Sequence, residues 1–471
     1  MIRRLFVALA ALGLGLQPVA AQPAYPPMPD IGTPKPFKVP GAETYRLANG
    51  MQVTLIPFGK VPKATISLRV YAGGLNEEGR TGLASLAAQM LREGAGGRNG
   101  ADIAAAAAGM GGNLSVGNSL HETSVGLGVL SDRAGDAIRL IGDIAMKPDF
   151  PASEFERVKQ SYLRQIAVAR SQPQVAADVA LAAAYYGADT PYGRLIPADD
   201  QVKAYALDDV RRFHAANFGA GRARLYVAGQ FDRAVVKAAI EQVFGGWATG
   251  PERLRLAPRP QVGPRVILVD RPGASQSTLR LTFPAPAAGD PRDLPFRVTN
   301  ALLGGSFTSR ITRNIREEKG YTYSPGSGIA FNPGEGAWTF NADVTTDVTG
   351  AALKEVFGEI RTLQTEAVPD EEGAGIRTWL AGTFVLQNAS PGGLINSIAT
   401  RDFHGLPADW LTTYVPGVLA VTNADIRRLA QAQLPLERMT LVVVGDLSKV
   451  EPQLKALPEL QSWQFQRVTP F

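Results

Sequence analysis

The chain has 471 residues, of which 45% are apolar and 19% are charged, and this composition is typical of a globular protein with two domains of about 200 residues each. The formal net charge of +5 is too small and too evenly spread to indicate nucleic-acid binding. Cysteine is absent, which excludes disulfides, thiolate metal sites and a cysteine nucleophile.

Residues 1–21 have the three parts of a secretory signal peptide. A basic start at Arg3–Arg4 precedes an apolar run over residues 5–16, and small residues follow at 19–21. Because a membrane anchor needs about 20 apolar residues, we expect cleavage before Gln22 instead. The sequence therefore predicts an exported, periplasmic protein with no membrane span in the mature chain.

A proline-rich arm is predicted next, over residues 22–42, because seven prolines fall between Pro23 and Pro40. The folded part is expected to start at Glu43. Its first elements are expected to be strands at residues 45–47, 52–57, 64–71 and 123–130, and helices at 83–91, 133–146 and 154–170.

An internal repeat divides the chain into two similar halves. The sequence Asp-Val-Arg-Arg at positions 209–212 recurs as Asp-Ile-Arg-Arg at positions 425–428. The segment 224–232 matches 440–448 with the same spacing, and 53–57 matches 266–270 with nearly the same spacing. We therefore expect two homologous domains, 43–248 and 265–465, joined by a linker at 249–264.

The fold class follows from the order of the elements. Strands and helices are mixed along the chain without a strict alternation, which favours an α+β fold. Each domain is predicted to be a mixed, largely antiparallel sheet with helices packed on it.

The segment 314–323, Asn-Ile-Arg-Glu-Glu-Lys-Gly-Tyr-Thr-Tyr, is typical of a helix end that turns into a strand. Upstream of it, Phe307, Ile311 and Ile315 recur every four residues and predict one apolar helix face. The helix is expected to end at Lys319, because the glycine that follows suits a left-handed helix stop.

This turn is expected to bring Arg316 and Tyr323 within reach of one point in space, where both could bind a ligand. A structural interpretation is also open. The helix dipole favours a cation in the last helical turn, and a tyrosine near the start of a strand is common. The pattern alone does not decide between the two.

The longer segment 305–323, which reads Gly-Ser-Phe-Thr-Ser-Arg-Ile-Thr-Arg and then the ten residues above, resembles the second-domain motif of the pitrilysin/insulinase family of zinc peptidases. The resemblance extends over about residues 43–450. It implies that the two domains form half of a clam-shell chamber. It also implies that Arg316 and Tyr323, seven positions apart, hold a substrate at the metal site of the other half.

The family's zinc site is missing from this sequence. In the family, a helix after the second strand carries HxxEH, in which two histidines bind zinc and the glutamate is the general base. Residues 79–89 match the approach to this motif, but the three positions are Ser85, Ala88 and Gln89. The third zinc ligand, a glutamate on a later helix, falls on Leu163. The resemblance therefore implies no metal and no other cofactor in this chain.

A self-sufficient peptidase with an unusual metal site has little support in the sequence. His121, His214 and His404 are far apart along the chain and lack the partner spacing of a metal motif. We interpret them as structural or surface histidines.

The retained pair and the lost zinc site together resemble the non-catalytic subunit of bacterial heterodimeric members of the family. This implies a subunit of a zinc metalloendopeptidase that is inactive alone and pairs with a homologous subunit carrying HxxEH and zinc. Arg316 and Tyr323 would then act in trans on a peptide, donating hydrogen bonds to the developing oxyanion. The alternative is a catalytically silent scaffold or peptide-binding protein of the same fold. The retention of both residues argues against it.

Overall fold

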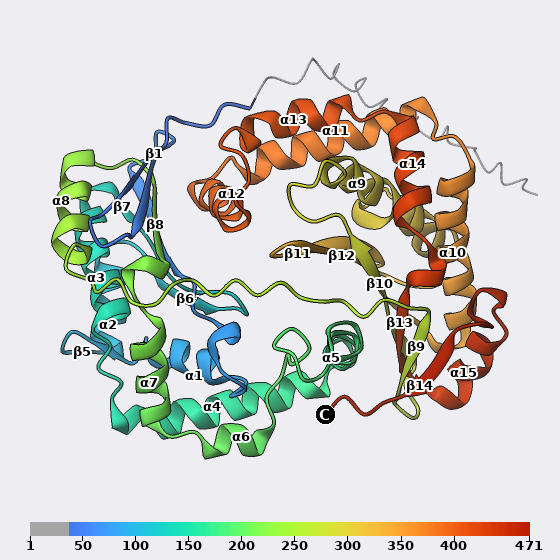
Figure 1. Cartoon of the computed structure of the whole chain (residues 1–471), viewed down its shortest axis with the longest axis horizontal. Helices are drawn as coiled ribbons and strands as arrows, with labels where there is room; N and C mark the ends of the chain where they lie inside the picture. The colour runs from blue at the N-terminus through green and yellow to red at the C-terminus, as the bar shows by residue number, and fades with distance from the viewer. Residues whose placement is uncertain (1–36) are drawn as a thin grey trace, which may run out of the picture. The chain divides into compact units, whose positions relative to one another are not determined.

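Two six-stranded sheets, each covered by helices, make up residues 37–471, the part of the chain that the computed structural model describes (Figure 1). The predicted signal peptide and residues 22–36 of the predicted arm lie outside the described residues. No helix within residues 37–471 is long and apolar enough to cross a membrane.

The first sheet has the strand order β1-β2-β8-β3-β7-β6. Its strands are β1 (Glu43–Arg46), β2 (Gln52–Pro57), β3 (Lys63–Val70), β6 (Leu114–Asn118), β7 (Thr123–Leu130) and β8 (Ala223–Gly229). The helices of this half are α1 (Leu83–Met90), α2 (Gly100–Gly109), α3 (Ala134–Met146), α4 (Ala152–Ser171), α5 (Pro173–Tyr186), α6 (Asp199–Ala204), α7 (Leu207–Asn217) and α8 (Arg233–Phe244). A small hairpin pairs β4 (Gly94–Ala95) with β5 (Arg98–Asn99).

The second sheet has the order β14-β9-β13-β10-β12-β11. Its strands are β9 (Arg265–Asp270), β10 (Gln276–Ala285), β11 (Gly326–Asn332), β12 (Glu335–Thr345), β13 (Thr440–Gly445) and β14 (Gln464–Arg467). The helices of this half are α9 (Asp293–Asn300), the π-helices η4 (Ala301–Gly305) and η5 (Thr312–Glu318), α10 (Thr349–Thr365), α11 (Asp370–Gln387), α12 (Pro391–His404), α13 (Trp410–Ala420), α14 (Asn423–Gln433) and α15 (Leu447–Lys455).

Both sheets are mixed and largely antiparallel, as predicted. In the first sheet only β2 and β8 run parallel. In the second sheet β9 runs parallel to both of its neighbours, β13 and β14, and the other pairs are antiparallel. The α+β fold class is therefore confirmed.

The internal repeat is confirmed at the level of strand register. Gln52 of β2 pairs with Arg224 of β8, and Arg265 of β9 pairs with Thr440 of β13. Gln52 and Arg265 are separated along the chain by the offset of one set of repeated segments, and Arg224 and Thr440 by the offset of the other. Equivalent sequence segments therefore occupy equivalent positions in the two sheets.

The two halves exchange one helix each. Helix α5 belongs to the first half in sequence, but Ala176, Ala177 and Ala180 pack on apolar residues of β9 and β13 in the second sheet. Helix α12 of the second half packs near β8 of the first sheet, where the Tyr226 hydroxyl donates to Asp402 at 3.0 Å (Figure 1). This exchange gives each half a share of the other's core, so the two sheets are held by apolar contacts in addition to the connecting linker.

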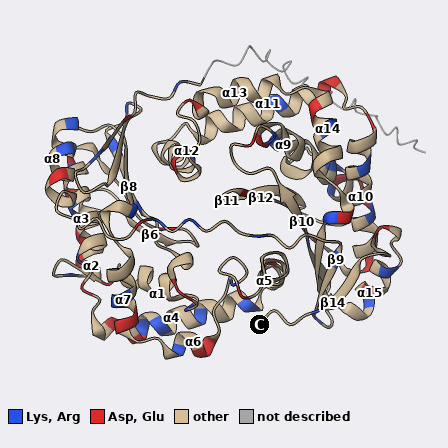
Figure 2. Cartoon of the chain, viewed as in Figure 1, with Lys and Arg blue, Asp and Glu red and all other residues tan. Residues whose placement is uncertain are grey.

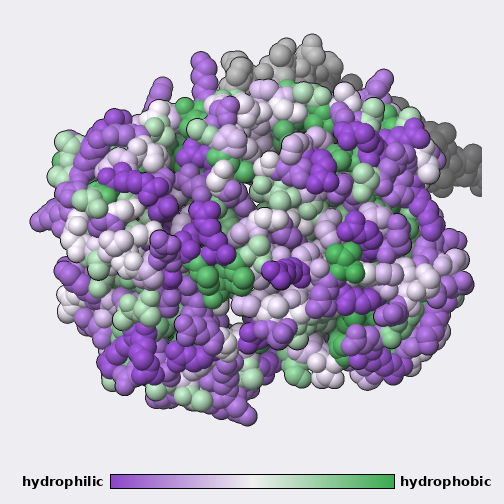
Figure 3. Space-filling view, in the orientation of Figure 1, coloured by the Kyte–Doolittle hydropathy of each residue, from purple (hydrophilic) through white to green (hydrophobic). Residues whose placement is uncertain are grey.

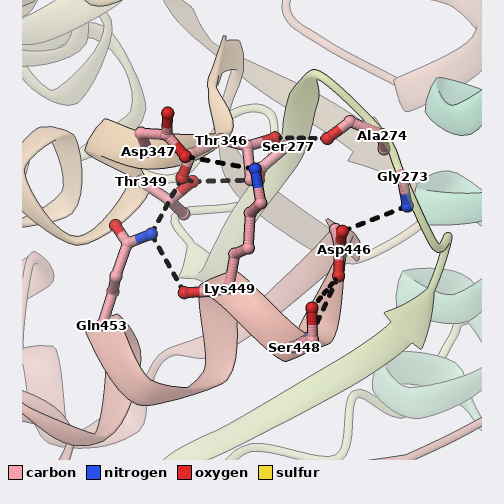
Figure 4. A network of polar contacts seen from close by, with 10 residues as sticks. All are labelled: Gly273, Ala274, Ser277, Thr346, Asp347, Thr349, Asp446, Ser448, Lys449 and Gln453. Atoms are coloured by element: carbon pink, nitrogen blue, oxygen red, sulfur yellow. Dashed lines mark hydrogen bonds and ion pairs between the residues drawn. The ribbon is translucent and has the colours of Figure 1, made fainter.

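A polar network closes one end of the second sheet, where the β9–β10 turn meets α15 (Figure 4). The Thr349 hydroxyl donates to Thr346 O at 2.8 Å, and a second hydrogen bond of 2.9 Å joins it to the Ser277 hydroxyl. Gln453 Nε2 donates to the same Thr346 carbonyl at 2.9 Å, and Gly273 N donates to Asp446 at 3.1 Å. These bonds satisfy buried polar groups at the sheet end, which gives the network a structural role.

The face of the described chain shown in Figures 2 and 3 is of mixed charge and mostly hydrophilic. Lys and Arg are interspersed with Asp and Glu, without a large region of one sign in this view (Figure 2). Hydrophilic residues cover most of the same face and leave only small separate hydrophobic patches (Figure 3). This face therefore differs from the continuous basic surface that is typical of nucleic-acid-binding proteins.

Candidate functional site

The segment that carries Arg316 folds as the π-helix η5, whose turns are wider than those of an α-helix. Ile311 and Ile315 are fully buried in the core of the second half and anchor this helix. The helix stops as predicted: Lys319 is its C-cap, and Gly320 follows with φ of +66°, a conformation that favours glycine.

Phe307 does not belong to the apolar helix face, so that part of the prediction was wrong. Ile311 and Ile315 are buried, but the Phe307 side chain is 64% exposed. The reason is local: residues 306–309 form a turn, closed by a bond of 3.1 Å from Ser309 N to Ser306 O, before the helix begins. Phe307 keeps the four-residue spacing in the sequence, but the turn directs its side chain away from the buried face that Ile311 and Ile315 share.

Arg316 instead lies between two exposed aromatic rings. Its guanidinium carbon is 4.3 Å from the centre of the Phe307 ring and 5.3 Å from the centre of the Tyr323 ring. Both distances are within the range of cation–π contacts. The structure therefore brings Arg316 and Tyr323 together, as the sequence predicted, and adds Phe307, which the sequence did not indicate.

Tyr323 lies in the loop between η5 and β11, and its side chain is 82% exposed. The preceding residue, Thr322, fixes this loop to the sheet. Thr322 is buried, forms an isolated bridge with Val344 and donates to Asp343 O at 2.7 Å. The loop backbone is thus anchored at the residue next to Tyr323, which leaves the phenol free to contact a ligand.

Arg316 and Tyr323 open into a pocket of about 440 Å³. Besides these two residues its wall consists of Gly304, Gly305, Ser306, Phe307, Thr312, Ser324, Pro325, Gly326, Ser327, Gly328 and Asn341. The wall is rich in glycine and serine, so an extended chain can approach the backbone closely.

The charge of Arg316 has no neutralising partner in the described part of the chain. Within residues 37–471 its guanidinium makes no ion pair and no hydrogen bond. Two arginines of the same segment differ: Arg310 binds Glu372 through two nitrogens, at 2.6 and 2.9 Å, and Arg313 reaches the same carboxylate at 3.4 Å. An oriented arginine with all its donors free is suited to bind a carbonyl oxygen or an anion.

The positions that correspond to HxxEH lie on α1. Ala88 is buried, and Ser85 and Gln89 are partly buried. Ser85 belongs to a chain of hydrogen bonds: its hydroxyl donates to Asn118 Oδ1 at 3.1 Å, Asn118 Nδ2 donates to Thr123 Oγ1 at 3.0 Å, and Thr123 donates to Ala72 O at 2.7 Å. The polar side chain at the first position is therefore bound within the protein.

Leu163 lies on α4 and packs partly buried against the first core. The hydroxyl of its neighbour Tyr162 lies beside Ser85 of α1. Burial raises the pKa of Tyr162 to about 12, although the Ser85 hydroxyl acts against this shift. A neutral phenol and an aliphatic side chain thus stand where the third zinc ligand was expected.

The residues at these positions do not fit a zinc ion, because they offer neither imidazole nor carboxylate. Across residues 37–471 there is no group of three or more His, Asp or Glu side chains that could hold a metal. The histidines are involved in packing instead. His121 and His404 both contact Phe403, so they are closer in space than their sequence positions suggest, and His214 Nε2 bonds Ala145 O at 2.9 Å.

Comparison with protein families gives two adjoining matches. Residues 55–197 match the family described as insulinase (peptidase family M16), and residues 205–378 match the family described as peptidase M16 inactive domain.

Similar proteins are found among bacteria. An uncharacterized zinc protease of Mycobacterium tuberculosis is 26% identical over 358 residues, which cover 74% of this chain and 78% of that protein. An uncharacterized zinc protease of Streptomyces coelicolor is 24% identical over 426 residues, covering 88% and 90%.

Solved structures share the fold. A peptidase M16 inactive domain from Pseudomonas fluorescens superimposes with a TM-score of 0.79 at 23% identity, covering 86% of this chain and 98% of that one. A protease from Helicobacter pylori gives the same TM-score at 18% identity, covering 87% and 100%. The chain therefore belongs to the insulinase family, peptidase family M16, as a member whose described residues contain no zinc site.

Proposed function

We propose that this protein is the non-catalytic subunit of a heterodimeric zinc metallopeptidase. In this proposal a homologous subunit with HxxEH holds the zinc, and this chain supplies Arg316 and Tyr323 in trans to the peptide bound there. The observation that carries the proposal is the guanidinium of Arg316, which lies between the rings of Phe307 and Tyr323 and has no polar partner within residues 37–471.

The chemistry required of the pair is hydrogen-bond donation. When water attacks a peptide carbonyl, the oxygen gains negative charge, and donors that are already oriented stabilise this charge without reorganising. Arg316 offers several N–H donors in a fixed plane, and Tyr323 offers one O–H donor. Neither group has to break an existing bond to a neighbouring side chain, since Arg316 has none within the described residues.

The position of the pair supports action in trans. Ser85, Ala88, Gln89 and Leu163 provide no ligand for a metal, so the activated water must come from another subunit in this proposal. Tyr323 is exposed on the pocket rim, where a second protein can reach it. Because neither subunit would be competent alone, we expect an interface larger than the standard ~1,600 Å².

The proposal includes export to the periplasm, which rests on the signal-peptide pattern of the chain's start. N-terminal sequencing of protein from the periplasmic fraction of the native host should find Gln22 at or near the start of the mature chain. Soluble cytoplasmic protein that retains Met1 would contradict export.

The main experiment combines purified mature chain with its zinc-bearing homologue. Alone, the chain should contain no stoichiometric zinc by elemental analysis and should cleave no peptide. Gel filtration of the mixture should show a complex, and cleavage should appear that neither chain produces separately. One zinc bound tightly per chain, or chelator-sensitive turnover by this chain alone, would overturn the proposal. A complex without any gain in cleavage would favour the scaffold interpretation.

A further inference from the structure

The first half contains a polar cavity of about 300 Å³ between α1, α4 and the end of β6, beside the positions where the zinc motif was expected. This volume is at the lower limit of small-molecule sites. Three charged residues line it: Glu77 and Arg194, which carry opposite charges, and Glu78, which is exposed. Ser85 and Asn118 also line it, and one hydrogen bond of 3.1 Å joins the Ser85 hydroxyl to Asn118 Oδ1.

Glu77 presents one free oxygen to the cavity. It is buried, and its Oε1 accepts hydrogen bonds from the backbone N–H groups of Gly82 and Ala84, at 3.0 and 2.8 Å. Its other oxygen, Oε2, has no donor among residues 37–471 and faces Gly74, another residue of the cavity wall. A buried carboxylate with one unbound oxygen is suited to accept from a cationic group.

Arg194 presents one free nitrogen to the same cavity. Its Nη2 donates to Asp189 O at 2.7 Å and its Nε to Thr190 O at 3.4 Å, so carbonyl groups fix the guanidinium plane. Nη1 has no acceptor among the described residues and lies beside Gly79 in the cavity wall. Because Arg194 and Glu77 form no direct ion pair, each keeps a charge that a ligand can neutralise.

We propose that this cavity binds a small zwitterion that carries an ammonium and a carboxylate group, of the class of free amino acids and short peptides. The ammonium group binds Glu77 Oε2, and the carboxylate binds Arg194 Nη1. A ligand with one charge would leave the opposite charge on the cavity wall unpaired, which disfavours simple cations and anions. The inference does not depend on the proposed heterodimer, because every group it uses belongs to this chain.

The experiment is calorimetric titration of the full mature chain with glycylglycine at about pH 7.5, where α-amino groups are still largely protonated. Two blocked probes separate the charges: N-acetylglycylglycine lacks the ammonium group and glycylglycinamide lacks the carboxylate. Glycylglycine should bind saturably, and each blocked probe should bind about tenfold to a hundredfold more weakly, as expected for losing a charged hydrogen bond.

Matched variants test the residues. Glu77→Gln keeps an acceptor for the Gly82 and Ala84 amides but removes the charge, and Arg194→Gln removes the cation. Each should weaken glycylglycine binding at least about tenfold. Glu78→Gln is the control, because Glu78 also lines the cavity but is exposed, and it should bind as wild type does. Thermal melting confirms that the variants are folded.

Three results would overturn the inference: no saturable binding of glycylglycine, equal binding of a blocked probe, or unchanged binding by both charge variants. If Glu77→Gln fails to fold, Arg194→Gln with the two blocked probes still decides the matter. Loss of activity in a reconstituted heterodimer has no bearing on these outcomes.

Discussion

The two halves share one sheet topology but use their polar side chains in opposite ways. In the first half, Ser85 of α1, Asn118 and Thr123 are linked by successive hydrogen bonds. The last of these bonds goes to a backbone carbonyl. In the second half, Arg316 of η5 and Tyr323 of the following loop line an open pocket, and the guanidinium of Arg316 has no polar partner among the described residues. Satisfied networks stabilise a fold, whereas free donors remain available to a ligand.

The same contrast appears within one segment of the second half. Arg310 is buried and bound through two nitrogens to Glu372, so its role is structural. Arg316, in the same helical segment, is half-buried, stacks near two aromatic rings and has no ion pair or hydrogen bond within residues 37–471. For these two arginines the residue type alone does not indicate the role. The presence or absence of a carboxylate partner is the better guide.

The largest expected effect concerns the hydrogen-bond donors of Tyr323 and Arg316. In the proposed heterodimer, Tyr323→Phe should lower kcat about 10²- to 10³-fold, because it deletes one of the two proposed donors to the oxyanion and keeps the ring beside Arg316. Arg316→Lys keeps the charge but loses the planar fork, and a loss of similar size is expected. Steady-state kinetics on one peptide measures both.

Two control variants match these changes. Tyr321→Phe removes a phenol that packs partly buried on the core, and Arg313→Lys alters the arginine that contacts Glu372. Both should leave kcat nearly unchanged. A rise in KM with constant kcat for Tyr323→Phe would show ordinary substrate contact instead of oxyanion stabilisation. Full activity of both site variants would return the scaffold interpretation to first place.

The next largest effect concerns Arg310, the arginine of the same segment that is paired with Glu372. Arg310→Met should lower the free energy of unfolding by about 3 kcal/mol, because Glu372 then loses its bidentate partner in a largely buried place. Arg313→Met, at an exposed position with a longer contact, should cost less than about 1 kcal/mol. Urea denaturation at one pH compares them, and equal costs would remove the structural distinction between the two arginines.

Glu77 provides a pH-dependent test in the first half. Burial raises the pKa of Glu77 from 4.5 to about 7, against the opposing effect of the Gly82 and Ala84 amides. The folded state therefore binds more protons than the unfolded state between these values, and this carboxyl's contribution to stability falls as pH rises from about 4.5 to 7. The loss amounts to no more than about 3 kcal/mol.

Glu77→Gln should remove this dependence while keeping the acceptor at the start of α1. The difference in unfolding free energy between variant and wild type, followed by urea titration from low to neutral pH, should move in favour of the variant as pH rises. Glu78 is exposed, so the unfolding free-energy difference between Glu78→Gln and wild type should not change with pH. A flat difference for Glu77→Gln as well would mean that the pKa of Glu77 is the same in the folded and unfolded states.

Much of the fold could be predicted from the sequence, because it depends on patterns that repeat or alternate. The strand over Thr123–Leu130 was predicted with its observed bounds, and the spacing of the repeat reappears in the strand register. The helix exchange could not be predicted. The small side chains of Ala176, Ala177 and Ala180 favour close packing, but nothing in the sequence states which of two homologous sheets they cover.

The site was predicted in part. The glycine stop after Lys319 determines the turn that brings Tyr323 back to Arg316, and that signal is local. Phe307 was misplaced because a four-residue period looks the same whether the chain continues as a helix or passes through a turn. Tyr162 was missed for a related reason: counting residues along α4 selects Leu163, whereas the rotation of the helix presents its neighbour to α1.

The smallest expected effect concerns Phe307, and it separates the two interpretations of that residue. If Phe307 orients Arg316 through its ring face, Phe307→Leu should lower kcat/KM of the heterodimer about twofold to fivefold, the size of an exposed cation–π contact. Phe307→Tyr keeps the ring face and should restore activity. Stability should not change in either variant, because the side chain is 64% exposed. The effect should also vanish when Arg316 is already replaced by lysine, since the fork that the ring orients is then absent. If activity and stability fell in parallel instead, and leucine cost the same with lysine at 316, Phe307 would act through local packing, and the orientation of Arg316 would have another cause.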